Sequence, residues 1–183
     1  MIIREAKIEE LDDVMAFYEM MCHELASKDF LPNGNKGGFP SLEMVTEAIK
    51  NSCLYVGEEN SEIAAAYIMN NECDPAYDAV PWRADADKEH ASVLHALRVA
   101  PKYCGRGYAG RLVEHAAETA RTRGQKAIRL DCLVENTIAH KLYLSRGFQI
   151  AGETEMYYED IGETRKFLMF ERVITDRLNL SEI

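Results

Sequence analysis

Apolar residues recur along this chain with two different periods. Where they stand three or four positions apart they predict helices, which we expect over residues 8–25, 42–50, 108–123 and 136–146. Short apolar runs bounded by turn-forming residues predict strands over residues 2–3, 53–58, 63–70, 91–99, 127–133, 148–152 and 167–173. Strands and helices alternate throughout, so the pattern predicts an α/β fold with a mixed sheet flanked by helices.

One stretch follows neither period. Residues 71–89, NECDPAYDAVPWRADADKE, hold the only tryptophan, Trp82, and six acidic residues. A connection of this length inside a compact domain is often functional, so Tyr77 and Trp82 are candidates for contact with a substrate. The alternative interpretation is an ordinary solvated surface loop.

Length and charge narrow the class of protein. The chain has 183 residues, 47% of them hydrophobic, which fits one domain spanning residues 1–183. Acidic residues outnumber basic ones by 31 to 21, for a formal net charge of -10. This charge repels nucleic acid and anionic membranes, so neither is expected as a partner. It is compatible with an amine-bearing substrate, although an ordinary acidic surface is the simpler interpretation.

The five cysteines are spread along the chain, and no two form a C-x-x-C pair. The sequence therefore indicates neither a zinc site nor a disulfide framework, and we expect no metal. The opening MIIREAKIEEL lacks the apolar core of a signal peptide, and no segment approaches the ~20 apolar residues that span a bilayer. We expect a protein of the reducing cytoplasm.

The segment VLHALRVAPKYCGRGYAG, residues 93–110, joins a predicted strand to a predicted helix through a glycine-rich loop. The first N–H groups of a helix are unpaired and carry partial positive charge, so this junction predicts an anion-binding site. Gly105, Gly107 and Gly110 match G-x-G-x-x-G, and Asp131 follows where a dinucleotide-binding fold places an acidic residue. A dinucleotide site is disfavoured, because residues 101–104 separate the loop from its strand and too little chain follows.

A second pattern lies on the helix predicted over residues 136–146. Asn136, Ala139 and Tyr143 are spaced i, i+3 and i+7, so they share one face of that helix. Taken alone, this spacing predicts no more than a half-buried core tyrosine.

Taken together, the two segments resemble the GNAT superfamily of acetyl-CoA-dependent N-acetyltransferases. The family pattern is L-x-V-x-P at the end of a strand, then [QR]-x-x-G-x-[GA], then N-x-x-A-x-x-L-Y-x-x-x-G-F. Here LRVAP occupies residues 97–101, CGRGYA residues 104–109 and NTIAHKLYLSRGF residues 136–148. The opening IIREAKIEELDDV is also similar to the family's first strand and helix. The resemblance implies a single-domain fold with a mostly antiparallel, twisted sheet.

The resemblance also implies acetyl-CoA as co-substrate and suggests what holds it. Strand backbone would pair with the pantetheine arm, loop amides would hold the pyrophosphate with added charge from Arg106, and Asn136 would contact the coenzyme from the following helix. Cys104 departs from the family pattern, which has Gln or Arg there, so we expect weaker but not abolished coenzyme binding. The expected coenzyme-binding residues are Leu97, Arg98, Val99, Cys104, Gly105, Arg106, Gly107, Tyr108, Ala109 and Asn136.

Acetyl transfer to an amine needs a neutral amine, a stabilised oxyanion and a proton for the leaving thiolate. By resemblance Tyr143 is the acid, and a phenol with a pKa near ~10 stays protonated at neutral pH. Cys132, on a predicted strand, is expected to be inert packing rather than an acetyl-carrying nucleophile.

The candidate base is His95, two residues before Leu97 and so expected on the same face of the strand. Its ordinary pKa of ~6.5 suits a base near neutral pH. Glu89 and His90 are weaker candidates. The alternative is a structural His95, with water carrying the proton to solvent.

The sequence therefore predicts direct acetyl transfer to a primary amine of a small molecule. One alternative is a protein acetyltransferase acting on N-termini or lysines, and the shape around residues 71–89 would distinguish the two. Another is a non-catalytic acyl-CoA-binding sensor. The ending VITDRLNLSEI could pack against a second copy, so a homodimer is a further expectation.

Overall fold

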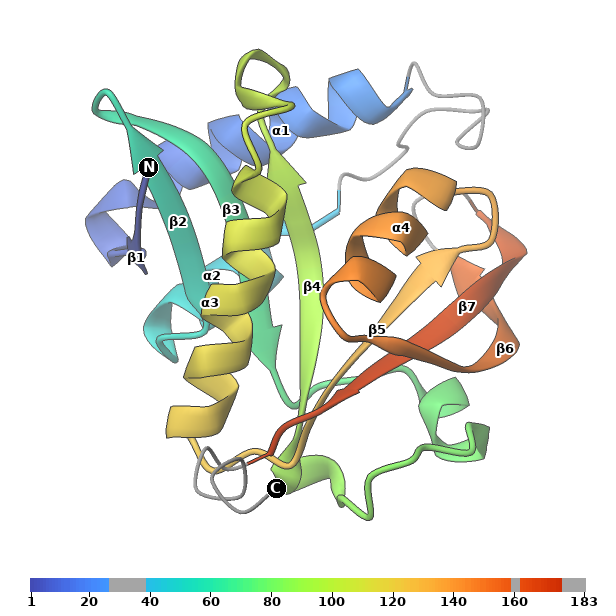
Figure 1. Ribbon diagram of the computed structural model, residues 1–183. Helices are drawn as coiled ribbons and strands as arrows, with labels where there is room; N and C mark the ends of the chain where they lie inside the picture. Colours follow the sequence, from blue (N-terminus) through green and yellow to red (C-terminus); the bar gives the residue numbers. More distant parts are fainter. Residues whose placement is uncertain (27–38, 159–161, 176–183) are drawn as a thin grey trace.

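The computed structural model describes residues 1–26, 39–158 and 162–175 (Figure 1). Seven strands form one sheet in the order β1-β2-β3-β4-β5-β7-β6. The strands are β1 (Ile2–Glu5), β2 (Leu54–Glu59), β3 (Glu62–Asn70), β4 (Ala91–Val99), β5 (Ala127–Leu133), β6 (Gln149–Tyr158) and β7 (Glu163–Val173). The α-helices are α1 (Leu11–Ala26), α2 (Leu42–Lys50), α3 (Tyr108–Thr122) and α4 (Thr137–Ser145).

The direction of strand pairing differs at the centre of the sheet. Neighbouring strands run antiparallel except β4 and β5, which are parallel. This pair is in register only where residues 91–93 meet residues 127–129. Beyond these positions the two strands diverge, as the green β4 and orange β5 show in Figure 1. The sheet therefore opens into a gap between its two halves.

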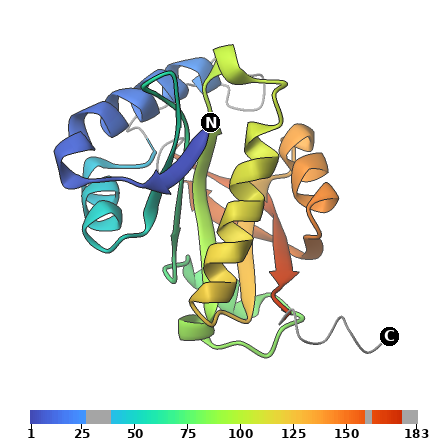
Figure 2. The same ribbon diagram turned by 60° about the vertical axis from the view of Figure 1, so that its left-hand side comes forward.

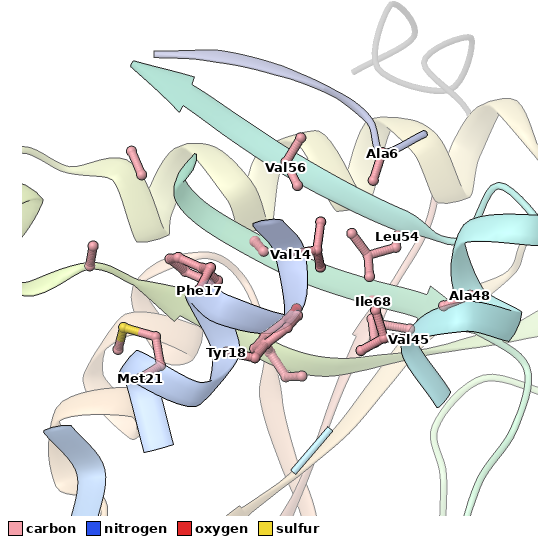
Figure 3. Packing of buried hydrophobic residues seen from close by; sticks show 14 of the residues in the cluster. Ala6, Val14, Phe17, Tyr18, Met21, Val45, Ala48, Leu54, Val56 and Ile68 are labelled. Atoms are coloured by element: carbon pink, nitrogen blue, oxygen red, sulfur yellow. The ribbon is translucent and has the colours of Figure 1, made fainter. Parts of the chain in front are cut away.

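Helices cover both faces of the sheet (Figure 2). On one face α1 and α2 pack against β2 and β3, and the core they form is shown in Figure 3. On the other face α3 and α4 lie over a second core. The apolar stripe that spacing predicted for α3 is buried there, at Leu112, Val113, Ala116, Ala117 and Ala120.

The structure confirms the predicted α/β fold with a mostly antiparallel sheet. The helix predicted over residues 8–25 begins as a 3₁₀ turn, Ile8–Glu10, before α1 starts. β6 and β7 are longer than predicted, because polar residues continue their pairing along the edge of the sheet, where one face can meet solvent.

Some expectations fall outside the described residues. They include residues 176–183 of the ending that we expected to pack against a second copy. In the parts of the chain that are described, no helix has the length and apolar character needed to cross a membrane.

Candidate active site

Strand β4 carries a bulge where it enters the gap. Its register with β3 shifts by one residue between His95 and Arg98. Within this stretch Ala96 has a φ of 49°, a left-handed value that few non-glycine residues adopt, and the Tyr18 hydroxyl donates to its carbonyl at 3.2 Å. In a regular strand, residues two positions apart share a face, and we therefore expected His95 and Leu97 to do so. The bulge interrupts this alternation, although both residues line the cavity described below.

The glycine loop leads from β4 into α3. Gly105 and Gly107 have φ values of 77° and 75°, which glycine adopts without the clash of a Cβ, and Gly107 is the N-cap of α3. Apart from chain neighbours, no described heavy atom lies within 4 Å of a Cβ built on either glycine. The first N–H groups of α3 have no carbonyl partner within the helix, so this open loop can bind phosphate oxygens.

A cavity of about 630 Å³, the central cavity, occupies the gap between β4 and β5. Its walls come from β4, the glycine loop, the first turn of α3, the end of β5 and α4. All the predicted coenzyme-binding residues line it except Arg106, whose guanidinium lies 5.2 Å from the centre of the Tyr103 ring. His95 and Tyr143 line it as well. The predicted acid, base and coenzyme cradle thus meet in one place.

Helix α4 brings Tyr143 to the cavity. Asn136 is the N-cap of α4, and its side chain accepts from the Ala139 N–H at 3.3 Å. The Tyr143 ring centre lies 5.6 Å from that of Phe148 and 5.8 Å from that of Phe170. Burial raises the pKa of Tyr143 above its ordinary range. The phenol is therefore protonated at neutral pH and can donate.

The surroundings of His95 differ from those expected of a base. Its Nε2 lies 2.9 Å from Asn70 Oδ1 and 3.1 Å from the Glu72 carbonyl oxygen. Because a carbonyl can only accept, Nε2 carries the proton and Nδ1 is the unprotonated nitrogen. Burial lowers the pKa of His95 to about 4. The ring is neutral at neutral pH and accepts a proton much less readily than free imidazole does.

Asp131 is a carboxyl group at this cavity that the sequence interpretation missed. It lies towards the end of β5, lines the cavity and accepts at Oδ2 a hydrogen bond of 2.7 Å from the Tyr77 hydroxyl. Burial raises the pKa of Asp131. The sequence suggested this residue only for a dinucleotide site. The feature that could have identified it is a carboxylate inside a mostly apolar strand, AIRLDCL.

Residues 71–89, here called the insert, contain the short 3₁₀ helix η2 (Pro75–Ala79), and a second one, η3 (Lys88–His90), begins at their end. Tyr77 is buried, and Trp82 Nε1 donates to its carbonyl at 2.8 Å. These two predicted substrate-binding residues line a second cavity of about 230 Å³ rather than the central one. Tyr77 reaches the central cavity only through its hydrogen bond to Asp131.

A buried ion pair fixes the insert to the sheet. Arg129 on β5 and Glu171 on β7 pair at 3.1 Å, with 9% and 0% of their side chains exposed. The other Glu171 oxygen accepts from the N–H groups of Arg83 at 2.7 Å and Ala84 at 3.2 Å. The Arg129 guanidinium lies 4.6 Å from the centre of the Trp82 ring. The sequence interpretation did not anticipate this anchor.

The cysteines at the cavity do not favour covalent chemistry. Burial raises the pKa of Cys132 to about 12, so its thiol is not ionised at neutral pH. Cys104 is exposed at the start of the glycine loop, with Sγ 3.8 Å from the Ala100 carbonyl oxygen. Within the described ranges, no three His, Cys, Asp or Glu side chains gather as a metal site would require.

Known proteins are similar to this chain in sequence or in structure. YesJ of Bacillus subtilis, an uncharacterized N-acetyltransferase, is 25% identical over 131 residues, which cover 72% of this chain and 67% of that protein. A GNAT-family acetyltransferase from Streptococcus agalactiae superimposes with a TM-score of 0.74 at 20% identity, over 96% of each chain. The Salmonella typhimurium protein yncA, solved with its cofactor acetyl-CoA, gives a TM-score of 0.67 at 14% identity, over 97% of this chain and 95% of that one.

A match to a family model shows which family the chain belongs to. The model of the acetyltransferase (GNAT) family matches residues 19–148, which include the bulged strand, the glycine loop, Asp131 and Tyr143. The chain therefore belongs to the GNAT family of acetyltransferases, enzymes that use acetyl-CoA as co-substrate.

Proposed function

We propose that the protein transfers an acetyl group directly from acetyl-CoA to the primary amine of a small molecule. The observation that carries this proposal is the central cavity, where the glycine loop, the bulged strand and Tyr143 meet. From residue 94 onward, no described strand pairs with β4 on its β5 side, so its backbone groups there can pair with the pantetheine arm. The loop amides and the start of α3 would hold the pyrophosphate.

Tyr143 supplies the proton for the leaving group in this proposal. The thioester C–S bond breaks with its electron pair on sulfur, and the sulfur takes the phenol proton. Support comes from the position of Tyr143 in the cavity wall and from the burial that keeps its phenol protonated. For His95 we propose an orienting role, because a neutral ring with a free Nδ1 can accept a hydrogen bond from the amine.

The fixed insert favours a small acceptor over a protein. Buried contacts to Glu171 and Asp131 hold it against the second half of the sheet, beside the central cavity. We propose that Tyr77 and Trp82 shape the acceptor side of the site from there. A protein substrate would instead need room for an extended chain along this side.

Titration calorimetry and a thiol-release assay test the proposal. We expect acetyl-CoA to bind, and thiol release above background with at least one of benzylamine, phenethylamine and spermidine. Release only with peptides that carry a free α-amino group or lysine would indicate a protein acetyltransferase instead. Binding without release for any acceptor would indicate an acyl-CoA sensor, and absence of binding would contradict the proposal altogether.

A further inference from the structure

Asp131 and Tyr77 join the insert to the central cavity, and they carry an inference that rests on the proposed function. We propose that Asp131 binds the ammonium group of the acceptor and takes its proton, and that Tyr77 is a positioning residue that holds this carboxylate in place. The insert is then part of the acceptor site through one side chain, although its own residues line a different cavity.

The first support is the charge balance around Asp131. Its carboxyl group is part-buried at the cavity, and among the described residues none forms an ion pair with it. A carboxylate withdrawn from water without a cation is costly, which is why burial raises the pKa of Asp131. An acceptor that enters the cavity as an ammonium ion supplies the missing positive charge.

The second support is how firmly Tyr77 is held. Its ring centre lies 5.4 Å from that of Trp82, and its carbonyl accepts from Trp82 Nε1. Asp74 caps the 3₁₀ helix that carries Tyr77 by accepting from the Ala76 N–H at 2.8 Å. Burial and the neighbouring Asp131 raise the pKa of Tyr77 well above its ordinary range, so the phenol acts only as a donor. With Oδ2 bound to Tyr77, the carboxylate has a fixed orientation towards the acceptor.

The proton steps balance with these groups. The ammonium gives one proton to the Asp131 carboxylate, and the freed lone pair forms the C–N bond to the acetyl carbon. The C–S bond breaks with its electrons on sulfur, which takes the Tyr143 phenol proton. A second proton leaves the nitrogen and restores the phenol, and Asp131 releases its proton to solvent. Acetyl-CoA and an ammonium ion thus become the amide, the free thiol and one proton.

The ionisation of Asp131 depends on the groups that face it from several elements. Its β7 neighbour in register, Met169, is apolar. The titratable and charged groups around it are Tyr77 and Asp74 of the insert, His95 and Arg98 of β4, Cys132 of β5 and Tyr143 of α4; the Arg98 guanidinium donates to the Leu97 carbonyl rather than to Asp131. Of these, only Tyr77 is a hydrogen-bond donor in contact with the carboxylate among the described residues. Removing its hydroxyl should therefore raise the pKa of Asp131 further.

Two substitutions test the proposal through pH profiles. Asp131→Asn should lower kcat/KM about 100-fold or more for the fastest amine of the panel, as expected when a positioned proton acceptor is lost. It should also abolish the acid limb of the kcat/KM profile. Tyr77→Phe should retain that limb but move it to higher pH, with roughly ten-fold lower kcat/KM at neutral pH because a charge-assisted hydrogen bond is lost.

A second measurement does not need turnover. In protein labelled with ¹³C at the aspartate carboxyl groups, the resonance that disappears in Asp131→Asn belongs to Asp131. Its titration midpoint should rise in Tyr77→Phe. Asp78→Asn is the matched control, since Asp78 lies on the same 3₁₀ helix and pairs with Lys88 at the surface. That variant should change neither the midpoint nor the kinetics.

Three results would overturn the proposal. The first is an acid limb of the kcat/KM profile that survives in Asp131→Asn, and the second is an acid limb that is lost only in His95→Gln. The third is a titration midpoint of the Asp131 carboxyl group that does not move in Tyr77→Phe. Acetyl-CoA binding, measured in parallel, should be unchanged in every variant. If the wild-type protein releases no thiol with any amine, the proposed function fails, while the carboxyl midpoint still decides whether Tyr77 controls Asp131.

Discussion

The two walls of the central cavity are built in different ways. The β4 wall, with the glycine loop and the start of α3, presents mainly backbone groups, shaped by a bulge and two left-handed glycines. The β5 wall presents side chains such as Asp131, whose hydrogen-bond partner Tyr77 is distant in sequence. Local backbone geometry therefore shapes the first wall, whereas the second wall depends on contacts between segments that are far apart in the sequence.

The largest expected effect tests whether the β5 wall depends on its buried ion pair. Glu171→Gln leaves Arg129 buried without a counter-charge, so we expect a loss of about 3–5 kcal/mol in the free energy of unfolding. Urea denaturation measures this. The control is Glu153→Gln, which breaks an exposed pair with Lys166 and should cost less than about 1 kcal/mol. Equal losses in the two variants would show that the buried pair is not the anchor.

Tyr143 is the one proposed catalytic side chain that lies between the two walls. Tyr143→Phe keeps the ring packing but removes the proton donor, so turnover should fall about 100-fold. Acetyl-CoA affinity by calorimetry should stay within about two-fold, because the ring still fills its place. Tyr157→Phe, at an exposed position, should change neither quantity. Unchanged turnover in Tyr143→Phe would remove this residue as the acid.

The β4 wall can be tested by straining its backbone. Gly107→Ala and Gly124→Ala each place a Cβ on a left-handed residue, at opposite ends of α3, and each should cost about 1–2 kcal/mol of stability. Only Gly107→Ala should also weaken acetyl-CoA binding. Each ~1 kcal/mol lost from the free energy of binding through strain in the loop should raise the dissociation constant roughly five-fold. If both variants bind acetyl-CoA equally well, the loop is not the phosphate cradle.

The smallest expected effect concerns Cys104. Cys104→Gln restores a residue type that the family pattern has at this position and adds an amide donor at the loop. We expect acetyl-CoA to bind a few-fold more tightly, consistent with one added hydrogen bond of about 0.5–1.5 kcal/mol. Cys104→Ser, which is too short to reach as far, serves as the control. Unchanged binding in Cys104→Gln would show that the backbone alone sets the affinity here, and weaker binding would contradict the expectation.

Sequence patterns predicted the β4 wall well because its determinants are local. Gly105, Gly107 and Pro101 act on their own backbone, and a helix start exposes its N–H groups whatever the rest of the fold does. The same holds for Asn136, which caps the helix that presents Tyr143. The bulge at Ala96 escaped prediction because strand register depends on pairing with β3.

The β5 wall could not be predicted in this way. Nothing near Asp131 in the sequence indicates Tyr77, because 54 positions separate the two. For a similar reason, the ordinary pKa of histidine did not predict the pKa of His95 in the folded protein. Burial, which only the packed fold produces, lowers it to about 4.

By itself, then, the sequence determined the order of strands and helices, the glycine-rich loop and the family, because these depend on residue type and short spacing. The tertiary structure alone decided how far β4 and β5 diverge, which carboxylate faces the cavity and how the insert reaches it. Those features arise from desolvation and from hydrogen bonds between distant segments, and these forces act only once the chain is folded.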